Sequence, residues 1–151
     1  TIGGFKPDDI TFIAGLSACS HGGLVEEGLQ IYRSMADDHG IKPRREHFAC
    51  VVDMLGRAGR LQDAEIFIRE MSMESDPLAW EALLGACRIH GEVELGERSA
   101  KKVMELEPHK DGAYVQLSNI YADRKLWEEK GKLRQRLDAS GLRKETARSW
   151  F

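Results

Sequence analysis

Few residues in this sequence have the types and spacing that could do chemistry. His90, Gly91 and Glu92 spell the HxE half of the signature of zinc-dependent deaminases, in which a His or Cys and two further Cys hold the metal and a Glu transfers protons. The CxxC half of that signature is missing, because no cysteine follows Cys87. The sequence also has no HExxH, GxSxG or phosphate-loop motif. We therefore expect no catalytic residue, no metal site and no cofactor in this chain.

The other histidines and the cysteines share no ligand spacing. The histidines concerned are His21, His39, His47 and His109, for which a solvated or capping role is expected. The cysteines, Cys19, Cys50 and Cys87, occur singly in apolar surroundings. This usage predicts free thiols in a reducing compartment rather than a disulfide framework.

The composition is that of a globular chain, with 42% hydrophobic and 31% charged residues among 151. No apolar run approaches the ~20 residues of a membrane span, and no signal peptide begins the chain, so we expect no membrane partner. The net charge of −3 gives no general attraction for nucleic acid. The charge is uneven, however, because residues 130–151 hold seven Lys or Arg against two acidic residues.

The elements that position these residues follow a repeat. The segments LSACSHGGLVEEG (16–28) and LLGACRIHGEVELG (83–96) match at an offset of 68 residues. When units start at Ile10, Glu46, Leu78 and Gly112, their lengths are 36, 32 and 34 residues. The third position of each unit is then aromatic: Phe12, Phe48, Trp80 and Tyr114. The fourteenth is Gly23, Gly59 and Gly91, and the nineteenth is Gly28, Ala64 and Gly96. Such self-similarity is typical of a repeat array.

Each unit has the pattern of a helix, a turn and a second helix. Apolar residues recur at spacings of three and four in ITFIAGLSAC and AWEALLGACRI, and again in the following segments LVEEGLQIYRSM and LQDAEIFIREM. The fourteenth residue supplies the positive φ that ends many helices, and the small nineteenth residue lets the second helix approach the first closely. The pattern predicts an all-α fold, a right-handed superhelical solenoid of helical hairpins. We expect Trp80 and Trp127 in the core, and an exposed apolar face at the N-terminal end.

The units resemble the C-terminal part of plant pentatricopeptide repeat (PPR) proteins of the PLS class. The resemblance covers essentially the whole chain and lies in four motifs in the family's order: CSHGGLVEEG, EHFACVVDMLGRAGRLQDA, WEALLGACRIHGEVELGE and AYVQLSNIYADRKLWEE. It implies a tail of a preceding repeat (1–9), a long-type repeat (10–45), a short-type repeat (46–77), two TPR-like extension (E) motifs (78–111 and 112–144) and a degenerate closing segment (145–151).

The function that this resemblance implies is recognition of organellar RNA, mostly as a site factor for C-to-U editing. The implied partners are single-stranded RNA, chosen mainly by upstream repeats, a cytidine deaminase domain in cis or in trans, and accessory editing factors, in the chloroplast or the mitochondrion. The family's closing segment, Lys-x-Pro-Gly-x-Ser-Trp, is matched by Lys144, Ser149 and Trp150, but residues 146–148 depart from it. That departure puts in doubt whether a deaminase follows in the usual geometry.

In this family the fifth and last residues of a unit select the base. The pairs here are Ala14 with Arg45, Cys50 with Pro77, and Ala82 with Asp111. Alanine and proline side chains offer no hydrogen bond, so base selection should be poor. Arg45, with Arg44, Arg57 and Arg60, could contact phosphates or could simply be solvated. The candidate RNA contacts are therefore Ala14, Arg45, Cys50, Arg57, Arg60 and Asp111.

The basic C-terminal segment is the candidate docking surface for partners. Lys132 and Arg136 are four residues apart and share a helix face, with Lys144, Ser149 and Trp150 beyond them. The alternative is a solvated polar face of the last helix. Two other functions fit the same fold: a peptide-binding TPR-like scaffold, and a PPR array for RNA splicing or stability.

Overall fold

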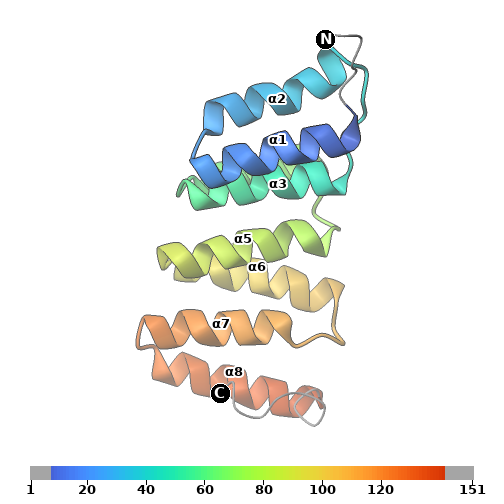
Figure 1. The fold of residues 1–151 in the computed structure, drawn as a ribbon. Helices are drawn as coiled ribbons and strands as arrows, with labels where there is room; N and C mark the ends of the chain where they lie inside the picture. Colours follow the sequence, from blue (N-terminus) through green and yellow to red (C-terminus); the bar gives the residue numbers. More distant parts are fainter. Residues whose placement is uncertain (1–7, 142–151) are drawn as a thin grey trace. The chain divides into compact units, whose positions relative to one another are not determined.

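The computed structural model describes residues 8–141, and these residues form α-helices joined by turns, without a strand (Figure 1). The all-α prediction is therefore confirmed. The helices are α1 (Asp9–Gly22), α2 (Val25–Asp37), α3 (Arg45–Arg57), α4 (Leu61–Glu70), α5 (Pro77–His90), α6 (Val93–Leu106), α7 (Gly112–Asp123) and α8 (Trp127–Ser140). Within residues 8–141, none of these helices has both the length and the apolar character needed to cross a membrane. The chain divides into two compact units, Thr1–Met73 and Glu74–Phe151.

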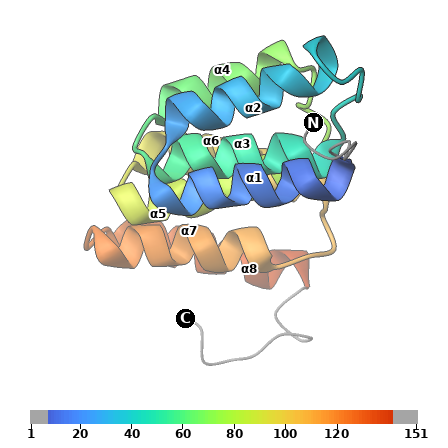
Figure 2. The ribbon, with the colours of Figure 1, turned by 45° about the horizontal axis from the view of Figure 1, so that its top comes forward.

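The first unit packs two helical hairpins in two layers. The first helices of the hairpins, α1 and α3, lie side by side, and α2 and α4 form the second layer (Figure 2). Aromatic rings join this second layer, because the Tyr32 and Phe67 ring centroids lie 5.5 Å apart in an edge-to-face arrangement. Side chains that are almost fully buried fill the space between the layers: Leu16, Met35, Val51, Val52, Met54 and Ile68. The apolar stripes predicted from the sequence thus face each other.

The second unit repeats the hairpin arrangement. Helix α6 packs against both α5 and α7, and α7 packs against α8 (Figure 1). Trp80 is fully buried, and its indole Nε1–H donates to the Glu74 carbonyl oxygen at 2.9 Å, so its predicted core position is confirmed.

The prediction that Trp127 is a core residue is wrong, because its side chain is 61% exposed. Trp127 begins α8, whose buried residues are Leu133 and Leu137. Leu133 is six positions after Trp127, so at about 100° per residue the two side chains point about 120° apart around the helix. Trp127 therefore lies off the buried stripe.

The helix ends follow local backbone chemistry. Gly23, Gly59 and Gly91 have φ values of 71°, 78° and 68°, as predicted for the residue that stops each first helix. His47 is buried at the start of α3, and its Nδ1 accepts a hydrogen bond from the Arg44 backbone N–H at 3.0 Å. The capping role expected of some histidines is therefore confirmed at this residue. Ile10, on α1, is largely exposed. The apolar face expected at the N-terminal end stays a prediction.

The small nineteenth residues lie at three-helix junctions. A Cβ on Gly28 would overlap the Met54 sulfur of α3 and lie 3.2 Å from the Cys19 Cβ of α1. A Cβ on Gly96 would lie 2.9 Å from the Ile120 Cδ1 of α7 and 3.4 Å from the Cys87 Cβ of α5. The predicted close approach of the second helix to the first helix of the same hairpin is confirmed at Gly28 and Gly96. At both glycines the tightest contact is with the first helix of the next hairpin.

Candidate nucleic-acid interface

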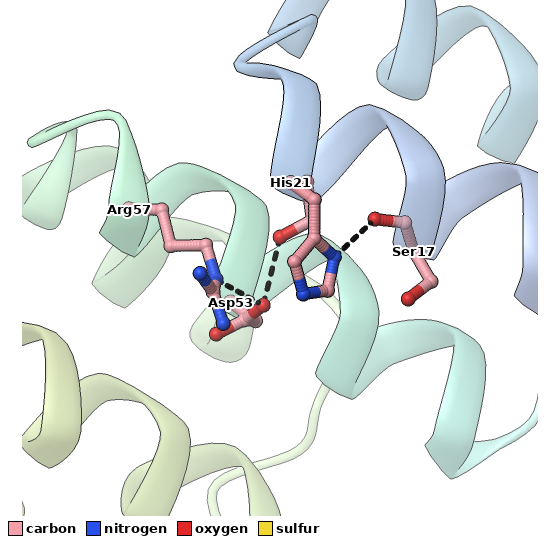
Figure 3. A network of polar contacts seen from close by, with 5 residues as sticks. Ser17, His21, Asp53 and Arg57 are labelled. Atoms are coloured by element: carbon pink, nitrogen blue, oxygen red, sulfur yellow. Dashed lines mark hydrogen bonds and ion pairs between the residues drawn. The ribbon is translucent and has the colours of Figure 1, made fainter.

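The fifth, eighth and twelfth residues of a unit share one face of its first helix, because their spacing is i, i+3, i+7. We call this face the first-helix stripe. The first compact unit (residues 1–73) contains two repeats, so its stripe comprises Ala14, Ser17 and His21 of α1 and Cys50, Asp53 and Arg57 of α3. Since α1 and α3 pack side by side, the two rows adjoin, and Figure 3 shows their polar members close together.

A hydrogen-bond network at this stripe joins the two first helices. The Asp53 Oδ2 accepts from the buried Ser20 hydroxyl of α1 at 2.7 Å and from the Arg57 Nε–H at 2.9 Å (Figure 3). The His21 Nδ1 lies 2.8 Å from the Ser17 carbonyl oxygen, so the proton of this bond belongs to the ring nitrogen. Asp53 thus holds the Arg57 guanidinium in place on the surface.

The network leaves Arg57 accessible to an anion. The Arg57 and Asp53 side chains are 47% and 43% exposed. Ion pairs of this kind contribute about 0–1 kcal/mol in water, so a phosphate can compete with Asp53 for the guanidinium. The stripe can therefore offer one oriented cation, the Arg57 guanidinium, to an RNA backbone.

The two fifth-position side chains are poor readers of a base. Ala14 is exposed and has no polar side-chain atom. Burial, and to a smaller extent the nearby Asp53 carboxylate, raises the pKa of the half-buried Cys50 thiol, which therefore stays a neutral, weak donor. These environments are in keeping with the poor base selection expected from the sequence.

Arg60 lies outside the stripe. Its Nε donates to Asp63 at 2.9 Å and its Nη1 to Glu26 at 3.0 Å. These hydrogen bonds raise the pKa of the guanidinium and tie the start of α4 to α2. Two carboxylates balance its charge, so this arginine links the second helices and is less suited than Arg57 to bind a phosphate.

The remaining RNA-contact candidates are more scattered. Arg45 is exposed at the first residue of α3, about 18 Å along the helix from Arg57 at 1.5 Å per residue. Asp111 precedes α7 in the second unit and is half-buried. Ala14, Cys50 and Arg57 thus lie on the first-helix stripe, and the other three candidates do not. Sequence reasoning missed Ser20 and Asp53, although the i, i+3, i+7 spacing would have placed Asp53 beside Cys50 and Arg57.

The first-helix stripe of the second unit has a different chemistry. Its residues are Ala82, Gly85 and Ile89 of α5 and Gln116, Asn119 and Asp123 of α7. Ile89, at the same twelfth position as His21 and Arg57, is 71% exposed. Asp123 lies next to Arg88, with 3.6 Å between the Oδ2 and Nε atoms. The stripe itself has no Lys, Arg or His, so it presents no positive charge to a phosphate.

Two of the five docking candidates lie on the described part of α8. Lys132 is exposed, with its Nζ 3.7 Å from both the Glu128 and the Glu129 carboxylates. Arg136 is exposed on the same face. The other three, Lys144, Ser149 and Trp150, lie outside the described residues.

The described residues contain no group of three or more His, Cys, Asp and Glu side chains placed to hold a metal ion. Cys19 and Cys87 are buried free thiols, and Cys50 is a half-buried one. His90 ends α5 on the surface, as expected of a helix end rather than a metal ligand.

Comparison with known proteins identifies the family. The PPR repeat model matches residues 16–39 and 47–75, and the E motif model matches residues 90–151. A chloroplastic pentatricopeptide repeat-containing protein of Arabidopsis thaliana, At3g49170, is 50% identical over 148 residues, which are 98% of this chain and 17% of that protein. The chloroplastic protein CRR2 of the same plant is 48% identical over 148 residues, 98% of this chain and 22% of that protein. The chain spans about a fifth of the length of these relatives. This chain therefore belongs to the pentatricopeptide repeat family and carries PPR repeats followed by an E motif.

Proposed function

We propose that this chain is part of an organellar site-recognition factor for C-to-U RNA editing, in which it positions RNA and recruits or orients a cytidine deaminase and accessory editing factors. The observation that carries the proposal is the contrast between the two first-helix stripes. The stripe of the PPR repeats presents Arg57 and His21, whereas the stripe of the second unit presents the exposed, apolar Ile89. Two relatives with chloroplastic names support a chloroplast address, with the mitochondrion as the alternative.

The first unit would contact the RNA backbone rather than its bases. A phosphate would take the place of Asp53 on the Arg57 guanidinium, while Asp53 kept its hydrogen bond to Ser20. Each phosphate contact with a single strand lowers the slope of log K against log salt by about 0.7, so binding by this unit should be weak and salt-sensitive. Sequence choice would come from other repeats of the whole protein.

The second unit would contact proteins. An isoleucine that is mostly exposed on a helix face is a favourable anchor for an apolar partner surface. The same feature suits a peptide-binding scaffold, so the identity of the bound protein decides between the two functions. The deaminase chemistry itself would come from another domain or protein.

Two substitutions in the purified chain test the proposal. Arg57→Gln should weaken binding of a labelled single-stranded RNA in fluorescence anisotropy and flatten its salt dependence, and leave capture of a deaminase domain and an accessory editing factor unchanged. Ile89→Asp should weaken capture of the deaminase domain and the accessory editing factor, and leave RNA binding unchanged. Binding of RNA but of neither protein would instead favour splicing or stability, and binding of unrelated peptides alone would favour the scaffold.

A further inference from the structure

A hollow of about 280 Å³ lies on the surface of α8 and is lined by Trp127, Lys130, Gly131 and Arg134. These residues share one helix face, because they are spaced at three, four and seven residues. The Lys130 ammonium lies 5.7 Å from the centroid of the Trp127 ring. The exposed indole is therefore part of an aromatic and cationic surface.

Packing does not explain the glycine in this hollow. Glycine in a helix interior destabilises the helix relative to alanine. At Gly28 and Gly96 neighbouring helices require it, because a Cβ would meet side chains at once. A Cβ on Gly131 would meet nothing within 4 Å. What this glycine does is keep the surface open between Trp127 and Arg134.

We propose that the hollow binds one nucleotide of a single-stranded RNA, with the base stacked on Trp127 and the neighbouring phosphates at Lys130 and Arg134. Tryptophan beside cations is the combination with which proteins hold single strands without regard to sequence. The volume lies near the lower end of that of ligand pockets, about 300–1,000 Å³, and suits one planar group rather than a folded segment.

The charges around the hollow favour an anionic ligand. Among the carboxylates near the hollow along the chain, Glu128 and Glu129 contact Lys132. Asp138 lies one turn beyond Arg134 on the same helix face, so two cations and one carboxylate share this face. Lys132 is five residues from Trp127, and therefore about 140° from it around the helix at about 100° per residue. An acidic peptide could use the two cations but would leave the indole face without a partner. The nucleotide site extends the proposed function, on which it rests, by placing a contact with RNA in the second unit.

The test is fluorescence anisotropy of a labelled oligouridylate titrated with the whole chain at several salt concentrations. Trp127→Ala should weaken binding about 5- to 150-fold, the range that stacking of one base supplies. Trp127→Phe should restore most of the affinity. The slope of log K against log salt should stay unchanged for Trp127→Ala, but Arg134→Gln should flatten it by about 0.7. Ile66→Ala, which alters an exposed apolar side chain of the first unit, is the matched control and should bind as the unchanged chain does.

A second variant separates loss of the site from loss of folding. Gly131→Leu should fill the hollow and reduce the affinity, while circular dichroism shows an unfolding temperature that is unchanged or higher. Full affinity of Trp127→Ala, absence of RNA binding by the unchanged chain, or competition by oligoglutamate as effective as by unlabelled oligouridylate would each overturn the proposal. Absence of RNA binding by the unchanged chain would also overturn the RNA contact proposed at Arg57, whereas the other two results would leave that contact standing. The proposed protein contacts at Ile89 are measured separately.

Discussion

Alanine substitutions at Gly28, Gly96 and Gly131 separate helix propensity from helix packing. All three glycines lie inside helices, so alanine should stabilise each helix by about 1 kcal/mol through the same backbone effect. They differ in what the added methyl group meets. Differences among the three variants in the free energy of unfolding therefore measure packing alone.

The contacts set the order of the three effects. At Gly131 the methyl group meets nothing within 4 Å, so alanine should stabilise the protein by about 1 kcal/mol. At Gly96 the nearest atom, Ile120 Cδ1 at 2.9 Å, is the mobile end of a side chain, and a packing cost of about 1 kcal/mol should cancel the gain. At Gly28 the methyl group overlaps the Met54 sulfur and also crowds the Cys19 Cβ, which is fixed to its backbone. There the cost should approach about 3 kcal/mol, and the net effect should be a destabilisation of about 1–2 kcal/mol.

Urea and thermal unfolding followed by circular dichroism would measure this order. One kcal/mol shifts the unfolding temperature of a unit of this size by about 4–8 °C. We expect the unfolding temperature to rise for Gly131→Ala, to change little for Gly96→Ala and to fall for Gly28→Ala. Equal shifts for all three, or stabilisation by Gly28→Ala, would refute the view that the small nineteenth residue is needed for packing.

Three further substitutions test the helix ends and one tyrosine. Gly91→Ala should cost about 1–2 kcal/mol in unfolding experiments, since the residue has a φ of 68°. Asp76→Ala should cost about 1 kcal/mol in the same experiments, because the Asp76 carboxylate accepts from the Leu78 N–H at 3.0 Å at the start of α5. Burial raises the pKa of Tyr32 from 10.0 to about 12, so its neutral form contributes stability that is complete below pH 10 and is lost as the pH rises towards 12. Tyr32→Phe should remove that part of the alkaline loss of stability, and an unchanged alkaline profile would contradict the assignment.

Features that depend on local backbone could be predicted from the sequence. The repeat register located the helix pairs, the positive-φ residues such as Gly23, and the crowded positions Gly28 and Gly96, because each follows from a turn or a close helix contact of the repeat pattern. The aromatic third position likewise placed Trp80 in the core.

Features that depend on contacts between hairpins could not be predicted. Ser20 and Asp53 are 33 residues apart, and only the packing of α1 against α3 brings them together. The two carboxylates on Arg60 come from different helices for the same reason. Trp127 was misplaced because it is not at the aromatic third position of its unit, so the repeat gave no information on its burial.

The two units show how one backbone can present different surfaces. The helical hairpins, their glycine stops and their close-packed small residues recur in both, so these features support the fold and carry no information on the ligand. The first-helix stripe differs between the two units, and its side chains are exposed or half-buried. At the twelfth position the first unit has His21 and Arg57, and the second has Ile89 and Asp123. A cation that a neighbouring carboxylate orients suits a phosphate, whereas an exposed isoleucine next to an ion pair suits a protein surface. In the proposed function, the difference between the RNA contact at Arg57 and the protein contact at Ile89 therefore rests on a few surface positions, while the scaffold that presents them stays the same.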